Sequence, residues 1–507
     1  FSSILNEKLF SPSRWYISDG TDYPSKNNKY FFNYKNLLLN LIKKNNIAVI
    51  YMIYPQETGY GSVFEDASHY FSLTPSLEQH IEDLKAQLKK IEGNKNKEVL
   101  AEQLTKQITN STEKLEEERL ARIERLDAVS TKIIELCEGD NWQETQQLSA
   151  KLLGTLMLLT RGPEGNFARV HMRFKPLYKA VLTLRLVDRL LEHDTIAHKY
   201  LSKYREAASR FRGNRYWRDK CKTELGRPLI TAALLQDIGL QSPAALTILK
   251  GENGDLDEFR LLEESQRKDL LKLNYHFTLK YLSEGLGLPK YVGNNKEERD
   301  RFVQTHKEAN EFLQQLVKDA FVSKTGLGEI VKIPQIYVSI VLSTKSDYSR
   351  MSLPKGYMLI EQLAKKGGLN KQLAQDFVEL VGYFPQGFGI TYIPMNEKGH
   401  EKDQYECAIV IGLNPANPAE PLCKVVTRNQ KYITSGTQEI IPKGRNLYFP
   451  ANRKKLMRVG KDRLSEIMSQ LSSNFTPDAL DDLVPSFWEP YDFFGFKKHQ
   501  NLWAKNK

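Results

Sequence analysis

The chain has 507 residues, of which 40% are hydrophobic and 27% charged, and its formal net charge is +11 at pH 7. This length predicts about two to four domains, and the globular composition excludes a chain that is disordered throughout. No apolar run approaches the roughly twenty residues that cross a bilayer, so we expect no membrane span. The positive charge favours an anionic partner: a nucleotide, a nucleic acid, an acidic protein or a membrane surface.

The sequence has four cysteines, which lie far apart and form no paired spacing: Cys137, Cys221, Cys407 and Cys423. Scattered cysteines are typical of reduced thiols in the cytoplasm, so we expect a cytoplasmic protein. Their spacing gives no zinc-binding pattern. The sequence begins with Phe1 rather than Met, which leaves room for residues before it.

Residues 1–73 predict a small α/β cap whose role the sequence leaves open. Its strand candidate spans residues 46–54, an apolar run that ends at Pro55. Proline has no N–H to donate to a neighbouring strand, so the strand is expected to stop there.

Residues 74–141 predict a coiled coil or a helical hairpin. Thr74 and Pro75 are typical of a helix start. Apolar residues then recur at alternating spacings of four and three: Leu77, Ile81, Leu84, Leu88 and Ile91. The pattern breaks at residues 93–97 and resumes at Leu100. Two arrangements remain open, a hairpin within one chain or a homodimer that pairs residues 77–136 of two copies. We favour the hairpin, because short helices are marginal alone.

Residues 142–388 have nearly continuous helical periodicity. From there to residue 460, β signals predict a small extension with strand candidates at 389–393, 407–411, 424–427 and 446–449. Residues 461–507 predict a helix, at 462–471, followed by an aromatic tail. The expected fold class is therefore mainly α with α+β parts.

Three landmarks in this region resemble one known family. Residues 232–239, Ala-Ala-Leu-Leu-Gln-Asp-Ile-Gly, are similar to the Ala-Ala-Leu-Leu-His-Asp-Ile-Gly signature of HD-domain phosphohydrolases. Residues 248–259 resemble the loop and acidic helix start that follow it. Residues 382–390, Gly-Tyr-Phe-Pro-Gln-Gly-Phe-Gly-Ile, look like the closing turn of HD-GYP domains, the family of cyclic-di-GMP phosphodiesterases. The resemblance implies an all-helical HD-type bundle over residues 142–388.

Family members hydrolyse phosphodiesters with two or three iron or manganese ions, which activate water and hold the phosphoryl oxygens. At the positions that match the family's metal ligands this chain has Gln236, Asn274 and Ser346, and Lys318 stands in the stretch where paired histidines are expected. Amide, hydroxyl and ammonium groups bind such metals poorly or repel them. Asp237 is the one residual candidate. The resemblance therefore implies no metal site, no catalytic residue and no cofactor.

What the resemblance implies for function is a catalytically inactive HD-GYP-like protein. It would be a cyclic-di-GMP effector or an interaction scaffold in bacterial signalling, motility or surface attachment, with a GGDEF-domain protein as a candidate partner. The alternative is an active metal-dependent phosphodiesterase, a hydrolase, with a rearranged iron or manganese site that uses His171 or His306.

A basic, aromatic stretch at residues 199–227 supports a further alternative. Arginine binds phosphate and stacks on bases, so this stretch suits a cyclic dinucleotide or a single-stranded nucleic acid. A solvated amphipathic helix is the competing interpretation. The candidate ligand-binding residues are Arg205, Arg210, Arg212, Arg215, Tyr216, Trp217 and Arg218.

Overall fold

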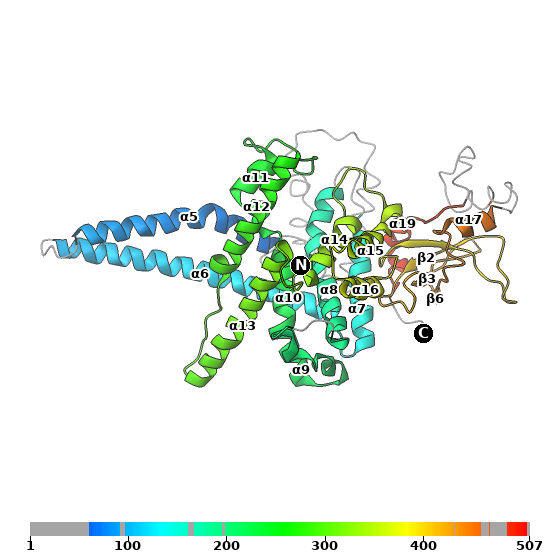
Figure 1. Cartoon of the computed structure of the whole chain (residues 1–507), viewed down its shortest axis with the longest axis horizontal. Helices are drawn as coiled ribbons and strands as arrows, with labels where there is room; N and C mark the ends of the chain where they lie inside the picture. Colours follow the sequence, from blue (N-terminus) through cyan, green and yellow to red (C-terminus); the bar gives the residue numbers. More distant parts are fainter. Residues whose placement is uncertain are drawn as a thin grey trace.

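The computed structural model describes residues 60–91, 97–160, 167–194, 198–429, 431–457, 466 and 484–503. A long helical hairpin projects from one end of a helical body, and a small antiparallel sheet lies at the other end (Figure 1). In the described part of the chain, every helix is too short or too polar to cross a membrane. The predicted strand at 46–54 lies outside the described residues, as does the predicted helix at 462–471 apart from Glu466.

The hairpin consists of α5 (Tyr60–Ile91) and α6 (Glu98–Cys137), which lie side by side in one chain (Figure 1). Two residues of the predicted seam in the first arm, Ile81 and Leu84, are buried between the arms. At the base, Arg125 of α6 forms an ion pair with Asp66 of α5, with 2.6 Å between Nη2 and Oδ1.

The helix start predicted at Thr74 and Pro75 is wrong, because α5 begins at Tyr60 and runs through both residues. Capping preferences are local, whereas the preceding turns are stabilised by packing. Val63 and Ala67 are buried in the main core, and Pro75 is tolerated inside the longer helix.

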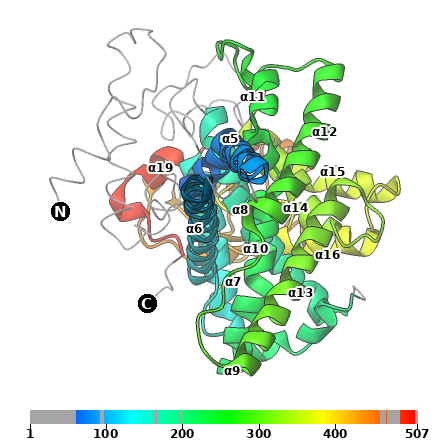
Figure 2. The ribbon, with the colours of Figure 1, turned by 90° about the vertical axis from the view of Figure 1, so that its left-hand side faces the viewer.

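Val63 of α5 already packs in the core of the body, and the body's helices follow in chain order. They are α7 (Trp142–Leu159), α8 (Phe167–Glu192), α9 (Arg215–Lys220), α10 (Arg227–Leu235), α11 (Pro243–Lys250), α12 (Glu264–Lys280), α13 (Lys296–Phe321), α14 (Glu329–Val341), α15 (Lys355–Lys365) and α16 (Lys371–Val381). Shorter turns between them are η3 (Leu201–Tyr204), η4 (Ala207–Arg212), η5 (Cys221–Gly226), η6 (Ile238–Gln241), η7 (Tyr281–Leu286) and η8 (Arg350–Ser352). In Figure 2, which looks nearly along the hairpin, the body's helices surround its base.

Helices α8 and α10 form the centre of the body. Every residue of α10 from Pro228 to Leu235 is buried, and most of α8 is buried as well. Helices α13, α14 and α16 cover this pair. The result is one continuous core that extends from the hairpin base to the sheet.

The sheet has four antiparallel strands in the order β1-β2-β3-β6. Their bounds are β1 (Gly389–Tyr392), β2 (Glu406–Val410), β3 (Leu422–Val425) and β6 (Gln438–Ile440). A separate pair, β4 (Thr427–Arg428) and β5 (Lys431–Tyr432), follows β3. The last helices are α17 (Pro450–Leu456), α19 (Tyr491–Gly495) and the turn η10 (Lys497–His499).

The strand predicted at residues 446–449 is wrong. Asn446 makes only an isolated bridge to Tyr392, and its side chain accepts a hydrogen bond from the Tyr448 backbone N–H at 3.0 Å. This local turn leads directly into α17, whose first residue is Pro450. The fourth strand of the sheet is β6 instead, which the sequence pattern missed.

Candidate functional site

The site lies where α10 ends. Gln236 caps the helix and Asp237 begins the turn η6. Gly239 then brings η6 against α12, because a Cβ at this position would lie 2.3 Å from the carbonyl oxygen of Asn274. A glycine is therefore required for this approach. The close contact carries Asp237 to the middle of α12.

A buried lysine from α8 reaches both residues. Lys179 Nζ donates a hydrogen bond to Gln236 Oε1 at 2.9 Å and lies 3.5 Å from Asp237 Oδ2. The Lys179 side chain is only 2% exposed, whereas that of Asp237 is 40% exposed. The carboxylate thus lies at the mouth of the site, with the ammonium behind it.

Two amides complete the shell around the carboxylate. Asn274 of α12 donates to Asp237 Oδ1 at 3.2 Å, and Gln335 of α14 donates to Oδ2 at 2.8 Å. The hydroxyl of Thr278 donates to the side-chain Oδ1 of Asn274 at 3.1 Å, which fixes the amide with its NH₂ toward Asp237. We call Lys175, Lys179, Gln236, Asp237, Asn274 and Gln335 the Asp237 cluster.

The Asp237 cluster contains two lysines but only one carboxylate. Burial lowers the pKa of Lys179, although the attraction of Asp237 opposes this shift. Burial also lowers the pKa of Lys175 to about 8; the attraction of Asp237 opposes this shift, and the repulsion of the Lys179 ammonium adds to it. Two lysines therefore share a single carboxylate whose oxygens already accept from Asn274 and Gln335.

The resemblance assigned four degenerate positions, and the structure brings three of them together: Gln236, Asp237 and Asn274. Ser346 lies in an exposed turn, and no recorded contact joins it to this group in the described residues. Within the described ranges, no group of three or more His, Cys, Asp or Glu side chains is arranged to hold a metal ion.

The stretch expected to match the family's paired histidines has a structural role. Asp319 accepts hydrogen bonds from the backbone N–H groups of residues 324, 325 and 328. Burial opposes ionisation of Asp319, but these hydrogen bonds outweigh it and lower its pKa. Its carboxylate therefore closes the loop after α13. Lys318 is exposed and lines the groove between α12 and α13.

The two histidines of the rearranged-site alternative lie in different surroundings. His171 is fully buried, and its Nδ1 lies 2.6 Å from the Ser343 carbonyl oxygen. Burial lowers the pKa of His171 to about 4, so it is neutral at physiological pH. His306 of α13 contacts the ring of Phe302 and lies near Asp127. No recorded contact in the described residues joins either histidine to Asp237.

The basic stretch at residues 199–227 is a series of short turns, η3, η4, α9 and η5, and not one helix. Arg210 is buried and paired with Glu138 and Asp188, so its guanidinium faces the protein interior. Arg218 pairs with Asp140 at 2.7 Å, and Arg205 lies 3.3 Å from Asp194.

Arg212, Arg215 and Tyr216 of this stretch point to the surface. All three are exposed, and no carboxylate among the described residues pairs with either arginine. Lys220 lies over the rings of Tyr216 and Trp217, at 5.5 and 5.4 Å from their centroids. The free positive charge is therefore smaller than the sequence indicates.

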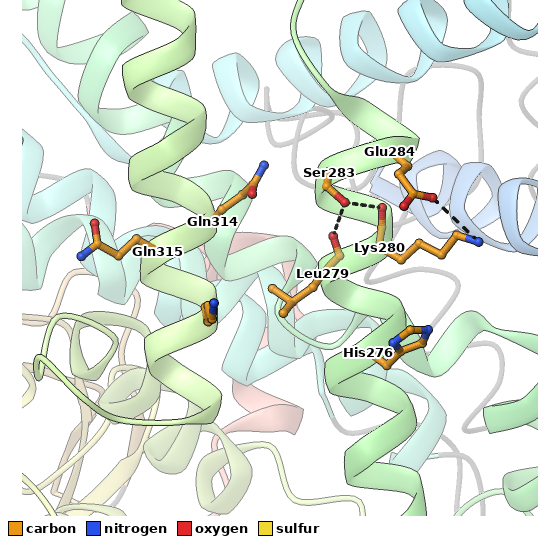
Figure 3. Close-up of a pocket in the computed structure, with 8 residues that line it drawn as sticks. His276, Leu279, Lys280, Ser283, Glu284, Gln314 and Gln315 are labelled. Carbon is orange, nitrogen blue, oxygen red and sulfur yellow. Dashed lines mark hydrogen bonds and ion pairs between the residues drawn. The ribbon is translucent and has the colours of Figure 1, made fainter.

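A groove of about 530 Å³ lies between α12 with η7 and α13. Leu279 and Gln314 point toward each other across it, whereas His276 and Gln315 point away (Figure 3). The ammonium of Lys280 lies 3.8 Å from the carboxylate of Glu284 on the same wall. The groove is open to solvent, most of its lining residues have polar side chains, and none of them belongs to the Asp237 cluster.

No family model, curated protein or solved structure matches this chain.

Sequence reasoning missed the lysines of the Asp237 cluster and Gln335. The signal for Lys179 was present, because it stands in an apolar stretch of α8 beside Leu177, Tyr178 and Ala180, with Lys175 one turn before it. A charged residue in such a stretch predicts a buried partner. No local signal identifies Gln335, which reaches Asp237 across 98 residues of sequence.

Proposed function

We propose that this chain is an HD-GYP-like protein that does not hydrolyse phosphodiesters and acts as an interaction scaffold or cyclic-di-GMP effector. The observation that supports this proposal is the position of Lys179. Its ammonium contacts Gln236 at 2.9 Å and lies 3.5 Å from Asp237, the pair that matches the family's His-Asp ligands.

An ammonium at this position cannot replace a divalent ion in hydrolysis. It has a single charge and no open coordination site, so it does not activate a water molecule as a metal does. The groups around the Asp237 carboxylate are hydrogen-bond donors and not metal ligands, because Asn274 and Gln335 direct N–H groups at its two oxygens. A cation would have to displace both amides and approach against Lys179. The cluster therefore suits a structural or binding role.

The scaffold role is supported by the way the hairpin joins the site. Helix α12 and its continuation η7 contact both. Asn274 reaches Asp237, while Phe277 packs on Phe71 of α5 with ring centroids 5.5 Å apart. Arg122 of α6 donates to the Gly285 carbonyl oxygen at 3.0 Å. A partner that binds the projecting hairpin would thus be connected, through α12, to the residues around Asp237. Such a partner, a GGDEF-domain protein for example, would place the chain in bacterial signalling, motility or surface attachment.

The test combines turnover with calorimetry. Purified full-length protein is incubated with cyclic di-GMP and Mn²⁺ or Fe²⁺, and the nucleotide is separated by chromatography. We expect no linear product above the level of an Asp237→Asn variant. Linear product that disappears in this variant would overturn the proposal. Calorimetric titration with cyclic di-GMP separates the two roles, because binding heat indicates an effector and its absence indicates a scaffold.

Single-stranded nucleic-acid binding is a second candidate, and one observation favours it. Arg212, Arg215 and Tyr216 are exposed together on α9 and the turn before it, and an exposed aromatic beside free arginines suits base stacking and phosphate contact. The double variant Arg212→Glu with Arg215→Glu should abolish a salt-dependent oligonucleotide shift. Arg205→Glu, which changes a paired arginine nearby, is the matched control. No shift of the unmodified protein at low salt would remove this candidate.

A further inference from the structure

The end of α8 carries a histidine whose ring is held by a buried carboxylate. His193 directly follows the last residue of α8, and its backbone N–H donates to the Arg189 carbonyl oxygen at 3.0 Å, which continues the helical pattern. Its Nδ1 lies 2.9 Å from Oδ1 of Asp376 on α16. The Asp376 side chain is 1% exposed, whereas that of His193 is 41% exposed. The imidazole is therefore fixed from the interior while part of its ring faces solvent.

The carboxylate determines which ring nitrogen of His193 is free. Arg189 Nε lies 3.2 Å from the same Oδ1, so the Asp376 carboxylate has a charged partner besides the imidazole. A carboxylate only accepts hydrogen bonds, so Nδ1 of neutral His193 carries the hydrogen and Nε2 carries the lone pair. In the part of the chain that the structure describes, Nε2 has no recorded hydrogen bond.

We propose that His193 is a phosphoryl acceptor, modified at Nε2 by small activated phosphoryl donors such as phosphoramidates and acyl phosphates. The geometry that supports this is an exposed imidazole that a buried carboxylate orients through Nδ1, which leaves the other nitrogen as a nucleophile. Such a modification is independent of the Asp237 cluster, because no residue of that cluster takes part.

The neighbouring guanidinium favours a phosphoryl group as the one transferred. Arg189 stands one helical turn before His193 and therefore on the same face of the helix. The recorded side-chain acceptors of its guanidinium are Asp376, Asn414 and Glu379. A guanidinium has more N–H groups than these three acceptors use, and guanidinium N–H groups bind phosphoryl oxygens well.

The transfer balances with the donor alone. With phosphoramidate, the Nε2 lone pair attacks phosphorus, the new N–P bond forms, and the P–N bond of the donor breaks. Ammonia leaves with the electron pair of that bond and takes a proton from water. The imidazole keeps its Nδ1 hydrogen and becomes a phosphoimidazolium, whose positive charge lies against the Asp376 carboxylate.

The experiment incubates the full-length protein with potassium phosphoramidate at neutral pH and follows each histidine by peptide mass spectrometry under alkaline conditions. His69, His80 and His276 are the internal comparators, because they are also exposed and no carboxylate is recorded on their rings among the described residues. Accessibility alone predicts similar rates at all four. We expect His193 to be phosphorylated about tenfold faster than each comparator, or more. A rate at or below theirs would overturn the proposal.

Phosphorus-31 NMR of the modified protein tests which nitrogen reacts. The two isomers of phosphohistidine give separate resonances, so the Nδ1 and Nε2 products are distinguishable. We expect the Nε2 isomer at His193, because Nδ1 is bonded to Asp376. The Nδ1 isomer as the main product at His193 would contradict the proposal.

The variant Asp376→Asn tests the cause. An amide can donate to Nδ1 as well as accept from it, so the tautomer is no longer fixed, and the rate at His193 should fall to that of the comparators. Glu379→Gln is the matched control: it removes the other carboxylate on Arg189, leaves the His193 hydrogen bond and should keep the fast rate. An unchanged rate in correctly folded Asp376→Asn would contradict the mechanism.

Two further points keep the test decisive. If Asp376→Asn fails to fold, the comparison among histidines in the unmodified protein decides alone. His193→Gln, with an unchanged circular dichroism spectrum, is the control that assigns the labelled peptide. None of these outcomes depends on cyclic di-GMP, so this proposal and the proposed function can fail separately.

Discussion

Near the base of the hairpin two arginines face two carboxylates, whereas at the Asp237 cluster two lysines share one. In the first group, Arg185 and Arg210 each contact Glu138 and Asp188, and all four side chains are 14% exposed or less. The attraction of the carboxylates outweighs burial and raises the pKa of both arginines. In the second group, burial outweighs attraction and lowers the pKa of both lysines.

The two groups differ in charge balance and in the kind of cation they contain. Guanidinium groups present several fixed donors, remain charged and pair with carboxylates in planar geometry, so a balanced set of four closes on itself. An ammonium changes its protonation readily when it is buried without full compensation. The four-residue group therefore joins α6, α8 and η4, whereas the Asp237 cluster contains the half-buried Lys175, whose pKa burial lowers to about 8.

The largest expected effect comes from Arg185→Met. This change leaves Glu138 and Asp188 buried with only Arg210, and an uncompensated buried charge costs about 3–5 kcal/mol of unfolding free energy. Urea denaturation followed by circular dichroism measures it. A loss below about 1 kcal/mol would show that the balanced group contributes little to stability.

The equivalent change in the other group, Lys179→Met, should be milder. Asp237 is 40% exposed and keeps its hydrogen bonds from Asn274 and Gln335, so no buried charge is stranded. We expect a loss of about 1–3 kcal/mol, which is the cost of leaving the buried Gln236 Oε1 without its donor. The same denaturation assay applies. A loss equal to that of Arg185→Met would erase the distinction between the two groups.

The pH dependence of stability should reveal Lys175. Its pKa is about 8 in the folded chain and about 10.4 in an unfolded one, so between these values the unfolded state binds more protons. Burying the charged form of Lys175 therefore lowers the unfolding free energy fully below pH 8, and this loss is removed as the pH rises toward 10.4. Measured against Lys175→Met, the unmodified protein should gain relative stability from pH 7 to pH 9.5. If the difference in unfolding free energy between the two proteins does not change with pH, the lowered pKa of Lys175 is contradicted.

The smallest effect is expected at an exposed pair. Arg205 and Asp194 lie 3.3 Å apart with side chains 63% and 66% exposed. Surface pairs contribute roughly 0–1 kcal/mol, so Arg205→Met should shift the denaturation midpoint barely above error. A large loss of unfolding free energy in Arg205→Met would mean that removing any charge destabilises the protein, whether or not the charge is buried.

Helical periodicity was a reliable guide where a helix has one apolar face. Phe312, Leu316 and Ala320, in the stretch predicted helical, are buried along α13. The strands that became β1 and β2 were also predicted, since they are short apolar runs between turns. The edge strand β6 was missed because it lacks the alternation of buried and exposed residues that marks a strand: Gln438 and Ile440 are exposed, and the residue between them is only half-buried.

The site was only partly predictable. Gln236, Asp237 and Asn274 were identified from a sequence pattern, and they do lie together. The residue that determines their chemistry, Lys179, stands 57 residues before Gln236 on another helix. Its position depends on how α8 packs against α10, and sequence periodicity does not specify that contact.

The most direct test of the central claim, that an ammonium takes the place of metal beside Asp237, is the metal content of the protein. Full-length protein and an Asp237→Asn variant are incubated with Mn²⁺ or Fe²⁺, desalted and analysed by inductively coupled plasma mass spectrometry. The account predicts well under one ion per chain, equal in both proteins. Two ions per chain in the unmodified protein, lost in the variant, would contradict it.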